Sequence, residues 1–146
     1  MKGVERMSNI LFTTAVTALG GREGKVQSED GVIQFDTAMP GTPRAKQVEN
    51  ATNPEQLFAA GYAACFDSAL QVTARKEKVK LESEVTAQVS LLKDEADQGF
   101  KLAVTLQVKG TNIEREQLQQ LVEKAHTVCP YSKATSGNID VTLEVL

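Results

Sequence analysis

Two long segments in the second half of the chain alternate between apolar and polar residues. Residues 79–91 carry apolar side chains at almost every second position, and residues 100–109 repeat the pattern. Because successive side chains of a strand point to opposite faces, each segment predicts a long strand with one buried and one solvated face. Such strands need helices to cover their apolar face. The residues expected to face inward are Val79, Leu81, Val85, Ala87, Val89, Leu91, Phe100, Leu102, Val104, Leu106 and Val108.

The first candidate for such a helix begins with a clear start signal. Asn53 suits the N-cap, Pro54 suits the first helical position, and Gln56 is spaced as in a capping box. The helix is predicted to continue to about Lys76. Small apolar residues at 59–64 predict that other backbone packs closely against it. The face expected to be buried comprises Leu57, Gly61, Ala64, Cys65, Ser68 and Val72.

The second candidate helix is predicted to begin near Thr111 or Asn112. Thr111 and Glu114 have the spacing of a capping box, and Pro130 ends the helix. Between them, apolar residues recur every three or four positions, which indicates one buried face. The residues of that face are Leu118, Leu121, Val122, Ala125, Val128 and Cys129.

The remaining elements are short strands and loops. Asp30-Gly31 is a hairpin signal between two of the strands. The element order β-β-β-α-β-β-α-β predicts an α+β fold with antiparallel sheets around two central helices. We expect a single domain over 9–146 after a flexible tail, 1–8. The other elements are strands at 10–19, 25–29, 32–36 and 139–145 and a loop at 37–51.

Composition narrows the possible partners and compartment. The 146 residues carry a formal net charge of -3, which argues against nucleic acid and anionic membranes as partners. No apolar run approaches the roughly 20 residues of a membrane span, and the N-terminus lacks a hydrophobic signal core. These features predict a cytoplasmic protein, in a compartment where disulfides are rare and are usually catalytic or redox-sensing.

The only two cysteines, Cys65 and Cys129, fall on the predicted buried faces of different helices. They are either inert core residues or one redox pair, because free cysteine is among the most buried residue types. Small neighbours of Cys65 would allow the close approach that a disulfide needs, but they also fit ordinary tight packing. Pro130 either ends the second helix or begins a short new one. In the second case Cys129 would be an N-cap facing unpaired N–H groups, which favour a thiolate.

Two charged residues offer chemistry that a core does not need. Arg22 lies in the glycine-rich turn at 20–24, and Glu55 lies in the first turn of the first helix. A guanidinium can offset the desolvation of a buried thiolate, and a carboxylate can hold that guanidinium in place. A surface-turn arginine and a solvated helix cap would explain the same residues.

Together these motifs resemble the organic hydroperoxide resistance branch of the OsmC/Ohr family. The resemblance rests on Asn53-Pro54-Glu55-Gln56-Leu57-Phe58-Ala59-Ala60-Gly61-Tyr62-Ala63-Ala64-Cys65-Phe66, on Val128-Cys129-Pro130-Tyr131-Ser132 and on Gly20-Gly21-Arg22. It covers nearly the whole chain from about residue 9. A short N-terminal extension and residues 48–51, which replace a glycine-richer segment, depart from the family pattern.

The resemblance implies a thiol-dependent peroxidase that reduces organic hydroperoxides. Cys65 would be the peroxidatic cysteine and Cys129 the resolving one, Arg22 would activate the thiolate, and Glu55 would orient Arg22. The family fold is an intertwined α+β homodimer. No bound cofactor is implied, and a dihydrolipoyl dithiol on a lipoylated protein would be the external reductant. Apolar walls for bulky peroxides would come from among Phe12, Phe35, Met39, Phe58, Phe66 and Tyr131.

Other interpretations stay open. His126 and Cys129 are spaced three residues apart on one helix, and Cys65 could join them at a metal, although one His and two Cys are a poor zinc signal. A Cys–His hydrolase is a second rival, but no nucleophile elbow is present. An OsmC-branch peroxidase of broader specificity, a redox sensor and a lipid-binding dimer are further alternatives.

Overall fold

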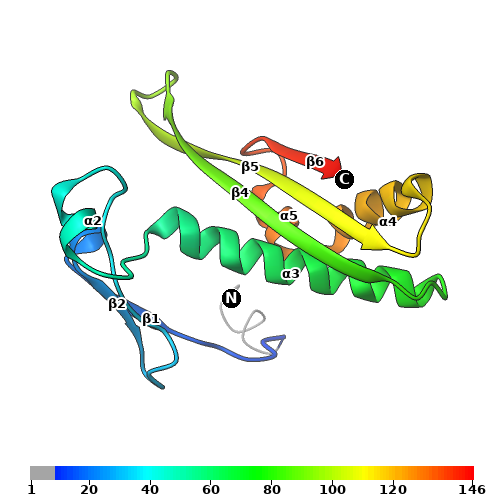
Figure 1. The fold of residues 1–146 in the computed structure, drawn as a ribbon, viewed down its shortest axis with the longest axis horizontal. Coiled ribbons are helices and arrows are strands. Elements are labelled where there is room, and N and C mark those ends of the chain that lie inside the picture. The colour runs from blue at the N-terminus through cyan, green and yellow to red at the C-terminus, as the bar shows by residue number, and fades with distance from the viewer. Residues whose placement is uncertain (1–8) are drawn as a thin grey trace. The chain divides into compact units, whose positions relative to one another are not determined.

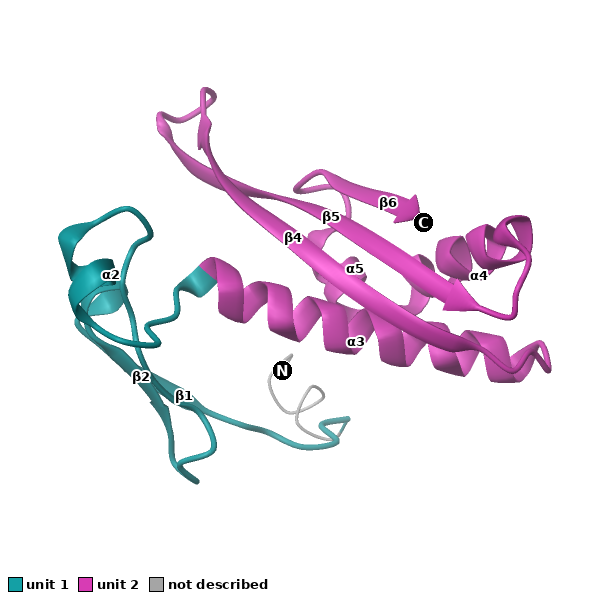
Figure 2. Cartoon of the chain, viewed as in Figure 1, with its two compact units in different colours: residues 1–54 teal, residues 55–146 magenta. Residues whose placement is uncertain are grey.

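The computed structural model describes residues 9–146, so the predicted tail, 1–8, lies outside the described residues. The chain divides into two compact units, one that ends at Pro54 and one that comprises Glu55–Leu146 (Figure 2). Each unit contains its own three-stranded sheet. The single domain over 9–146 therefore stays a prediction, and the two units are described separately.

The N-terminal unit is built on a small antiparallel sheet. Strand β2 lies in its centre, with β1 and β3 on either side, and pairs such as Ala18–Val26 and Val26–Phe35 define the register. A 3-10 turn, η1, connects β1 to β2. A short helix, α2, follows the sheet. The elements are β1 (Val16–Leu19), η1 (Gly21–Glu23), β2 (Lys25–Ser28), β3 (Gln34–Asp36) and α2 (Pro43–Gln47).

Two predictions for this unit are wrong in their boundaries. The strand predicted over 10–19 is regular only from Val16, because its partner strand ends at Ser28. The loop predicted over 37–51 contains α2. The signal for that helix was present: Thr42 is the N-cap, its hydroxyl accepts a 3.4 Å hydrogen bond from the Ala45 N–H, and Pro43 occupies the first helical position.

The C-terminal unit places one long helix against a mixed sheet (Figure 1). Strands β4 and β5 pair antiparallel from Glu82–Thr111 to Asp94–Gly99. Strand β6 pairs parallel with β5, so the expectation of purely antiparallel sheets is wrong for this strand. A parallel neighbour needs a crossover connection, and two helices supply it. The elements are α3 (Pro54–Lys76), β4 (Glu82–Asp94), β5 (Gly99–Thr111), α4 (Arg115–Val128), α5 (Pro130–Thr135) and β6 (Val141–Val145).

The core of this unit lies between the sheet and the helices, which confirms the predicted α+β class. Helix α3 has the predicted bounds, but the prediction of its buried face is wrong. A neighbouring face is fully buried, whereas Ala64, Ser68 and Val72 are exposed. Phe100 was predicted to face inward but is 69% exposed, because it lies beside the turn that joins β4 to β5. The buried face of α3 comprises Tyr62, Phe66, Leu70, Thr73 and Ala74.

Helix α4 begins later than predicted. Thr111 is the last residue of β5, where it pairs with Glu82 and donates a 3.1 Å hydrogen bond from its hydroxyl to the Glu82 carboxylate. It therefore does not cap the helix, whose N-cap is Glu114. Of the predicted buried face, Val128 is 51% exposed and the other members are buried. No helix within residues 9–146 is both long and apolar enough to span a membrane.

Candidate active site

The structure brings the two cysteines together from separate helices. Cys65 lies on α3, and Cys129 lies at the junction where α4 ends and α5 begins. Their side chains interact directly, and both thiols are free rather than joined in a disulfide. Cys129 is fully buried and Cys65 is half-buried, so Cys65 is the more accessible of the two. A free thiol pair of this kind can cycle to a disulfide and back.

Pro130 begins a new helix rather than only ending α4. Cys129 is its N-cap; its N–H donates to the Ala125 carbonyl (2.9 Å) and its carbonyl accepts from the Lys133 N–H (2.9 Å). The Cys129 side chain makes no capping hydrogen bond. Instead, the N–H of Tyr131, in the first turn of α5, hydrogen-bonds the sulfur of Cys65. The alternative in which Pro130 begins a new helix with Cys129 as its N-cap is confirmed, but the Tyr131 N–H bonds the sulfur of Cys65.

Opposing influences act on the Cys65 thiol. Burial raises its pKa, because the thiolate loses solvation. The hydrogen bond from the Tyr131 N–H lowers the pKa, and the neighbouring Cys129 thiol raises it. The net pKa is raised, with burial as the largest cause, and a raised pKa favours the less reactive thiol form of Cys65. A positive charge placed near the sulfur would favour the nucleophilic thiolate.

An aromatic cluster covers the helix beside the cysteines. The rings of Phe58, Tyr62 and Tyr131 lie 5.5–6.0 Å apart between centroids. The Tyr131 ring lies on Gly61, where an added side-chain carbon would lie 2.9 Å from Cζ of Tyr131. The small residue at Gly61 therefore admits an aromatic ring of α5. Phe66, another of the predicted pocket walls, is fully buried in the core.

The turn that carries Arg22 is tightly braced within the N-terminal unit. The buried hydroxyl of Thr37 donates to the Gly21 carbonyl (2.7 Å) and accepts from the Gly24 N–H (2.9 Å). Arg44 on α2 donates to the Thr37 carbonyl (2.8 Å) and to the Gly24 carbonyl (3.1 Å). Gly24 is required here, because an added side-chain carbon would lie 2.8 Å from the Gly20 Cα and would collide with the Leu19 carbonyl. Arg22 itself is half-buried.

The predicted site residues are divided between the two units. Glu55 lies in the first turn of α3 and is half-buried, in the same unit as Cys65 and Cys129. Arg22 belongs to the N-terminal unit. The cysteine pair is thus brought together, whereas the roles of Arg22 and Glu55 stay predictions.

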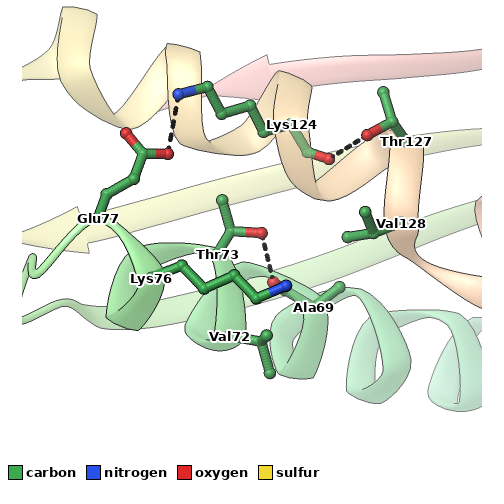
Figure 3. A pocket seen from close by; sticks show the side chains of 8 residues that line it. All are labelled: Ala69, Val72, Thr73, Lys76, Glu77, Lys124, Thr127 and Val128. Carbon is green, nitrogen blue, oxygen red and sulfur yellow. Dashed lines mark hydrogen bonds and ion pairs between the residues drawn. The ribbon is translucent and has the colours of Figure 1, made fainter.

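A groove lined by both apolar and polar side chains lies between α3 and α4 (Figure 3). Its volume is about 380 Å³. Lys124 forms a 2.9 Å ion pair with Glu77 across it, and the Thr73 hydroxyl donates to the Ala69 carbonyl (2.8 Å). None of the predicted site residues lines this groove. Its lining comprises Ala69, Val72, Thr73, Lys76, Glu77, Lys124, Thr127 and Val128.

The rival interpretation of a metal site has no support within residues 9–146, where no group of three or more His, Cys, Asp or Glu side chains is arranged to hold a metal ion. The His126 ring instead hydrogen-bonds Ser132 through Nδ1 (2.7 Å). Sequence reasoning missed Ser132 and the backbone N–H of Tyr131. The Pro130 helix start was the signal that could have found the N–H, because it places free amides after Cys129.

Comparisons with known proteins all point to the same family. The OsmC-like protein family model matches residues 46–144. The organic hydroperoxide resistance protein OhrA of Bacillus subtilis is 74% identical over 139 residues, which cover 95% of this chain and 99% of the relative. The organic hydroperoxide resistance protein OhrB of the same species is 55% identical over 135 residues, which cover 92% of this chain and 98% of OhrB.

Solved structures agree with the sequence comparison. The crystal structure of Bacillus subtilis OhrB superposes with a TM-score of 0.89 at 55% identity, and the match covers 94% of this chain and 100% of that one. A putative organic hydroperoxide resistance protein from Vibrio cholerae, with captopril bound in one of its active sites, gives a TM-score of 0.81 at 44% identity, over 94% of this chain and 93% of that one. The chain therefore belongs to the OsmC-like family, in its organic hydroperoxide resistance branch.

Proposed function

We propose that this protein is a thiol peroxidase that reduces organic hydroperoxides to alcohols. The observation that carries the proposal is the direct interaction of Cys65 on α3 with Cys129 at the α4–α5 junction. Its relatives are named for organic hydroperoxide resistance, which supports alkyl or fatty-acid hydroperoxides as the substrate class.

The chemistry runs in two steps. The Cys65 thiolate attacks the distal peroxide oxygen; the O–O bond breaks, the alkoxide leaves as an alcohol after taking up a proton, and Cys65 becomes a sulfenic acid. The sulfur of Cys129 then displaces the sulfenic hydroxyl, which leaves with the Cys129 proton as water and forms the disulfide. The more accessible thiol, Cys65, meets the substrate, and the buried one, Cys129, resolves the intermediate.

In this proposal Arg22 supplies the positive charge that favours the Cys65 thiolate. Its guanidinium favours the thiolate and polarises the peroxide, and Glu55 holds the guanidinium by a paired hydrogen bond. The bracing of the Arg22 turn by Thr37 and Arg44 supports this role, because a braced turn limits the positions that the guanidinium reaches.

The proposed cycle needs no bound cofactor, and an external dithiol restores the two thiols. A dihydrolipoyl group on a lipoylated protein attacks the disulfide through a mixed disulfide and leaves as the oxidised cyclic form. The reducing interior of the cytoplasm is the compartment where such a pair is kept reduced between turnovers.

We also propose that the working unit is a homodimer. Helix α3 leaves a row of small or apolar side chains exposed, at Ala60, Ala64 and Val72. Such a face is costly to leave in water, and close packing against a second copy would bury it. Equilibrium sedimentation would test the dimer directly, and a monomer at micromolar concentration would contradict it.

Intact mass spectrometry after one equivalent of cumene hydroperoxide tests the cycle. The wild-type chain is expected to lose two hydrogens, Cys129→Ser to gain oxygen, and Cys65→Ser to stay unchanged. Full peroxide consumption by Cys65→Ser would overturn the assignment.

Turnover separates the peroxidase from a redox sensor. With dihydrolipoamide in excess, the wild-type protein is expected to consume many equivalents of hydroperoxide at a steady rate. Oxidation that stops after one equivalent, despite the dithiol, would favour the sensor. Retained ester hydrolysis without peroxide turnover would favour the hydrolase.

A further inference from the structure

A chain of hydrogen bonds links the three helices around the cysteines. The buried hydroxyl of Ser132 on α5 lies 2.7 Å from Nδ1 of His126 on α4 and 2.9 Å from the hydroxyl of Tyr62 on α3. The Tyr62 hydroxyl also lies 3.3 Å from the Thr135 hydroxyl, which donates to the Ser132 carbonyl (3.1 Å). Ser132 is therefore the centre of the network, and each helix contributes to it.

The network surrounds the segment that holds the second thiol. His126 precedes Cys129 by one helical turn, and Ser132 follows it by one turn. Tyr62 precedes Cys65 by one turn on α3. The same short segment presents the Cys129 thiol and the Tyr131 N–H to the sulfur of Cys65. The network thus links the helix that carries Cys65 to the two helices that flank Cys129.

Helix α5 depends on such anchors. It is only six residues long, and a helix of that length is unstable in water without tertiary contacts. Apolar packing alone could hold it in the core at lower desolvation cost than three buried polar groups and a half-buried histidine. Hydrogen bonds add direction, because they fix both the distance and the orientation of the groups they join. Every buried polar side-chain atom in the described part of the chain has a hydrogen-bond partner, so the network is satisfied.

From this geometry we infer that the Tyr62–Ser132–His126 network is a positioning device for the resolving step, which holds Cys129 within reach of oxidised Cys65. Ser132 is its central positioning residue. The inference relies on the proposed function for the identity of the oxidant. The hydrogen bonds of the network join oxygen and nitrogen atoms and involve neither reacting sulfur. The network acts by restricting where the α4–α5 junction, and with it Cys129, lies relative to α3.

If the network positions Cys129, variants that break it should lower the effective concentration of the Cys129 thiol at Cys65. In the reduced protein, equilibration with oxidised and reduced glutathione gives the effective concentration of Cys129 at Cys65 without any peroxide. Ser132→Ala removes the shared hydroxyl with almost no change in volume. It is expected to lower that concentration roughly tenfold, which corresponds to about 1.4 kcal/mol. Tyr62→Phe keeps the ring, and His126→Asn keeps a polar group near Ser132; each removes only one branch of the network and is expected to produce a smaller loss.

Thr73→Val is the matched control. Thr73 is also a buried hydroxyl on α3, but it bonds only the Ala69 carbonyl of its own helix. Its loss is expected to leave the thiol equilibrium unchanged. In a second measurement, one equivalent of cumene hydroperoxide is added and products are separated by mass. Ser132→Ala is expected to raise the share of over-oxidised Cys65 at the expense of the disulfide, with the first oxidation as fast as in the wild type.

The outcomes separate the inference from the proposed function. An effective concentration in Ser132→Ala equal to that of the wild type would overturn the inference, even if the wild type consumes peroxide. The same loss in Thr73→Val would also overturn it, because the effect would then follow from general destabilisation. A selective loss in Ser132→Ala supports the inference, and it does so even if the wild type fails to turn over peroxide, in which case only the proposed function fails.

Discussion

The ring of Tyr131 fills the space that a side chain at Gly61 of α3 would occupy. A side-chain carbon at Gly61 would lie 2.9 Å from Cζ and 3.1 Å from Cε2 of the Tyr131 ring, and closer still to the hydroxyl oxygen. Tyr131 also supplies the N–H that bonds the sulfur of Cys65. The absence of a side chain at one residue therefore sets the position of the backbone that contacts the reactive thiol.

Gly61→Ala is expected to destabilise the protein despite the better helix propensity of alanine. Alanine favours a helix by up to about 1 kcal/mol over glycine, but a methyl group inserted into a packed contact costs about 1–3 kcal/mol. The Tyr131 ring cannot withdraw freely, because it packs against Phe58 and Tyr62 at 5.9 and 5.5 Å. Urea denaturation of the two proteins measures the difference.

The Tyr131→Ala protein, which lacks the ring, supplies the control for this prediction. In Tyr131→Ala, the space over Gly61 is free, so the same Gly61→Ala change is expected to stabilise the helix. A sign reversal between the two backgrounds identifies the ring contact as the cause. Destabilisation of equal size in both would show that some other contact at Gly61 is responsible.

The sequence was sufficient where local signals and tertiary packing agree. Helix α3 begins at Pro54 and ends at Lys76 as predicted, because its start signal and the residues that end it are local. Its buried face was predicted wrongly. The residues around Gly61 and Cys65 form an apolar stripe, which suggested that this face is buried. The larger side chains of Tyr62 and Phe66 fill the space under the sheet instead, so the neighbouring face of the helix is the buried one. Periodicity fixes which residues share a face, and the size of the partner surface decides which face is buried.

The candidate site was only partly accessible to sequence reasoning. The pairing of Cys65 with Cys129 was one of two open alternatives, since sequence spacing across α3, β4, β5 and α4 does not give distance. The parallel pairing of β6 was missed for a related reason: alternation shows that a strand is half-buried and does not show its direction. The Pro130 helix start indicated free N–H groups after Cys129 but not which thiol they would bond. The Ser132 network was not predictable, because it depends on the bend at Cys129.

Arg22→Ala is expected to shift the pH dependence of peroxide attack to higher pH. Burial already raises the pKa of Cys65, so removal of a stabilising positive charge raises it further and leaves less thiolate at neutral pH. Each unit of pKa lowers the thiolate fraction about tenfold below the pKa. Thiolate absorbance, titrated in a Cys129→Ser background, isolates Cys65. Arg22→Lys keeps the charge and is expected to recover part of the shift; identical titrations for all three proteins would exclude Arg22 from this role.

Arg44 is expected to affect catalysis through the turn that carries Arg22. Its side chain bonds two carbonyls at once, those of Thr37 and Gly24. Hydrogen bonds to a charged group contribute about 1.5–3 kcal/mol each, so Arg44→Ala should loosen the turn. We expect kcat/KM for cumene hydroperoxide to fall about tenfold, the effect of about 1.4 kcal/mol in the transition state. Arg44→Lys is expected to be nearly as slow, because lysine lacks the planar fork that reaches both carbonyls.

Lys46→Ala provides the comparison for Arg44. Lys46 is an exposed residue of the same short helix, and its removal takes away an equal charge without touching the turn. We expect wild-type kinetics from this variant. Equal losses of kcat/KM in the Arg44 and Lys46 variants would show that the effect comes from overall charge and that the bracing of the turn does not affect catalysis.

His126 is expected to make stability depend on pH below neutrality. Burial lowers the pKa of His126 in the folded protein, whereas the unfolded chain has the ordinary value of about 6.5. The folded state therefore binds this proton less readily than the unfolded state. The corresponding stability is fully present above about pH 6.5 and is lost as the pH falls through that value toward the lower folded pKa. We expect Tm to fall more between about pH 7.5 and 5.5 in the wild type than in His126→Asn, which keeps a polar atom near Ser132 but does not titrate. Equal Tm losses over that interval would show that His126 carries no share of the pH dependence.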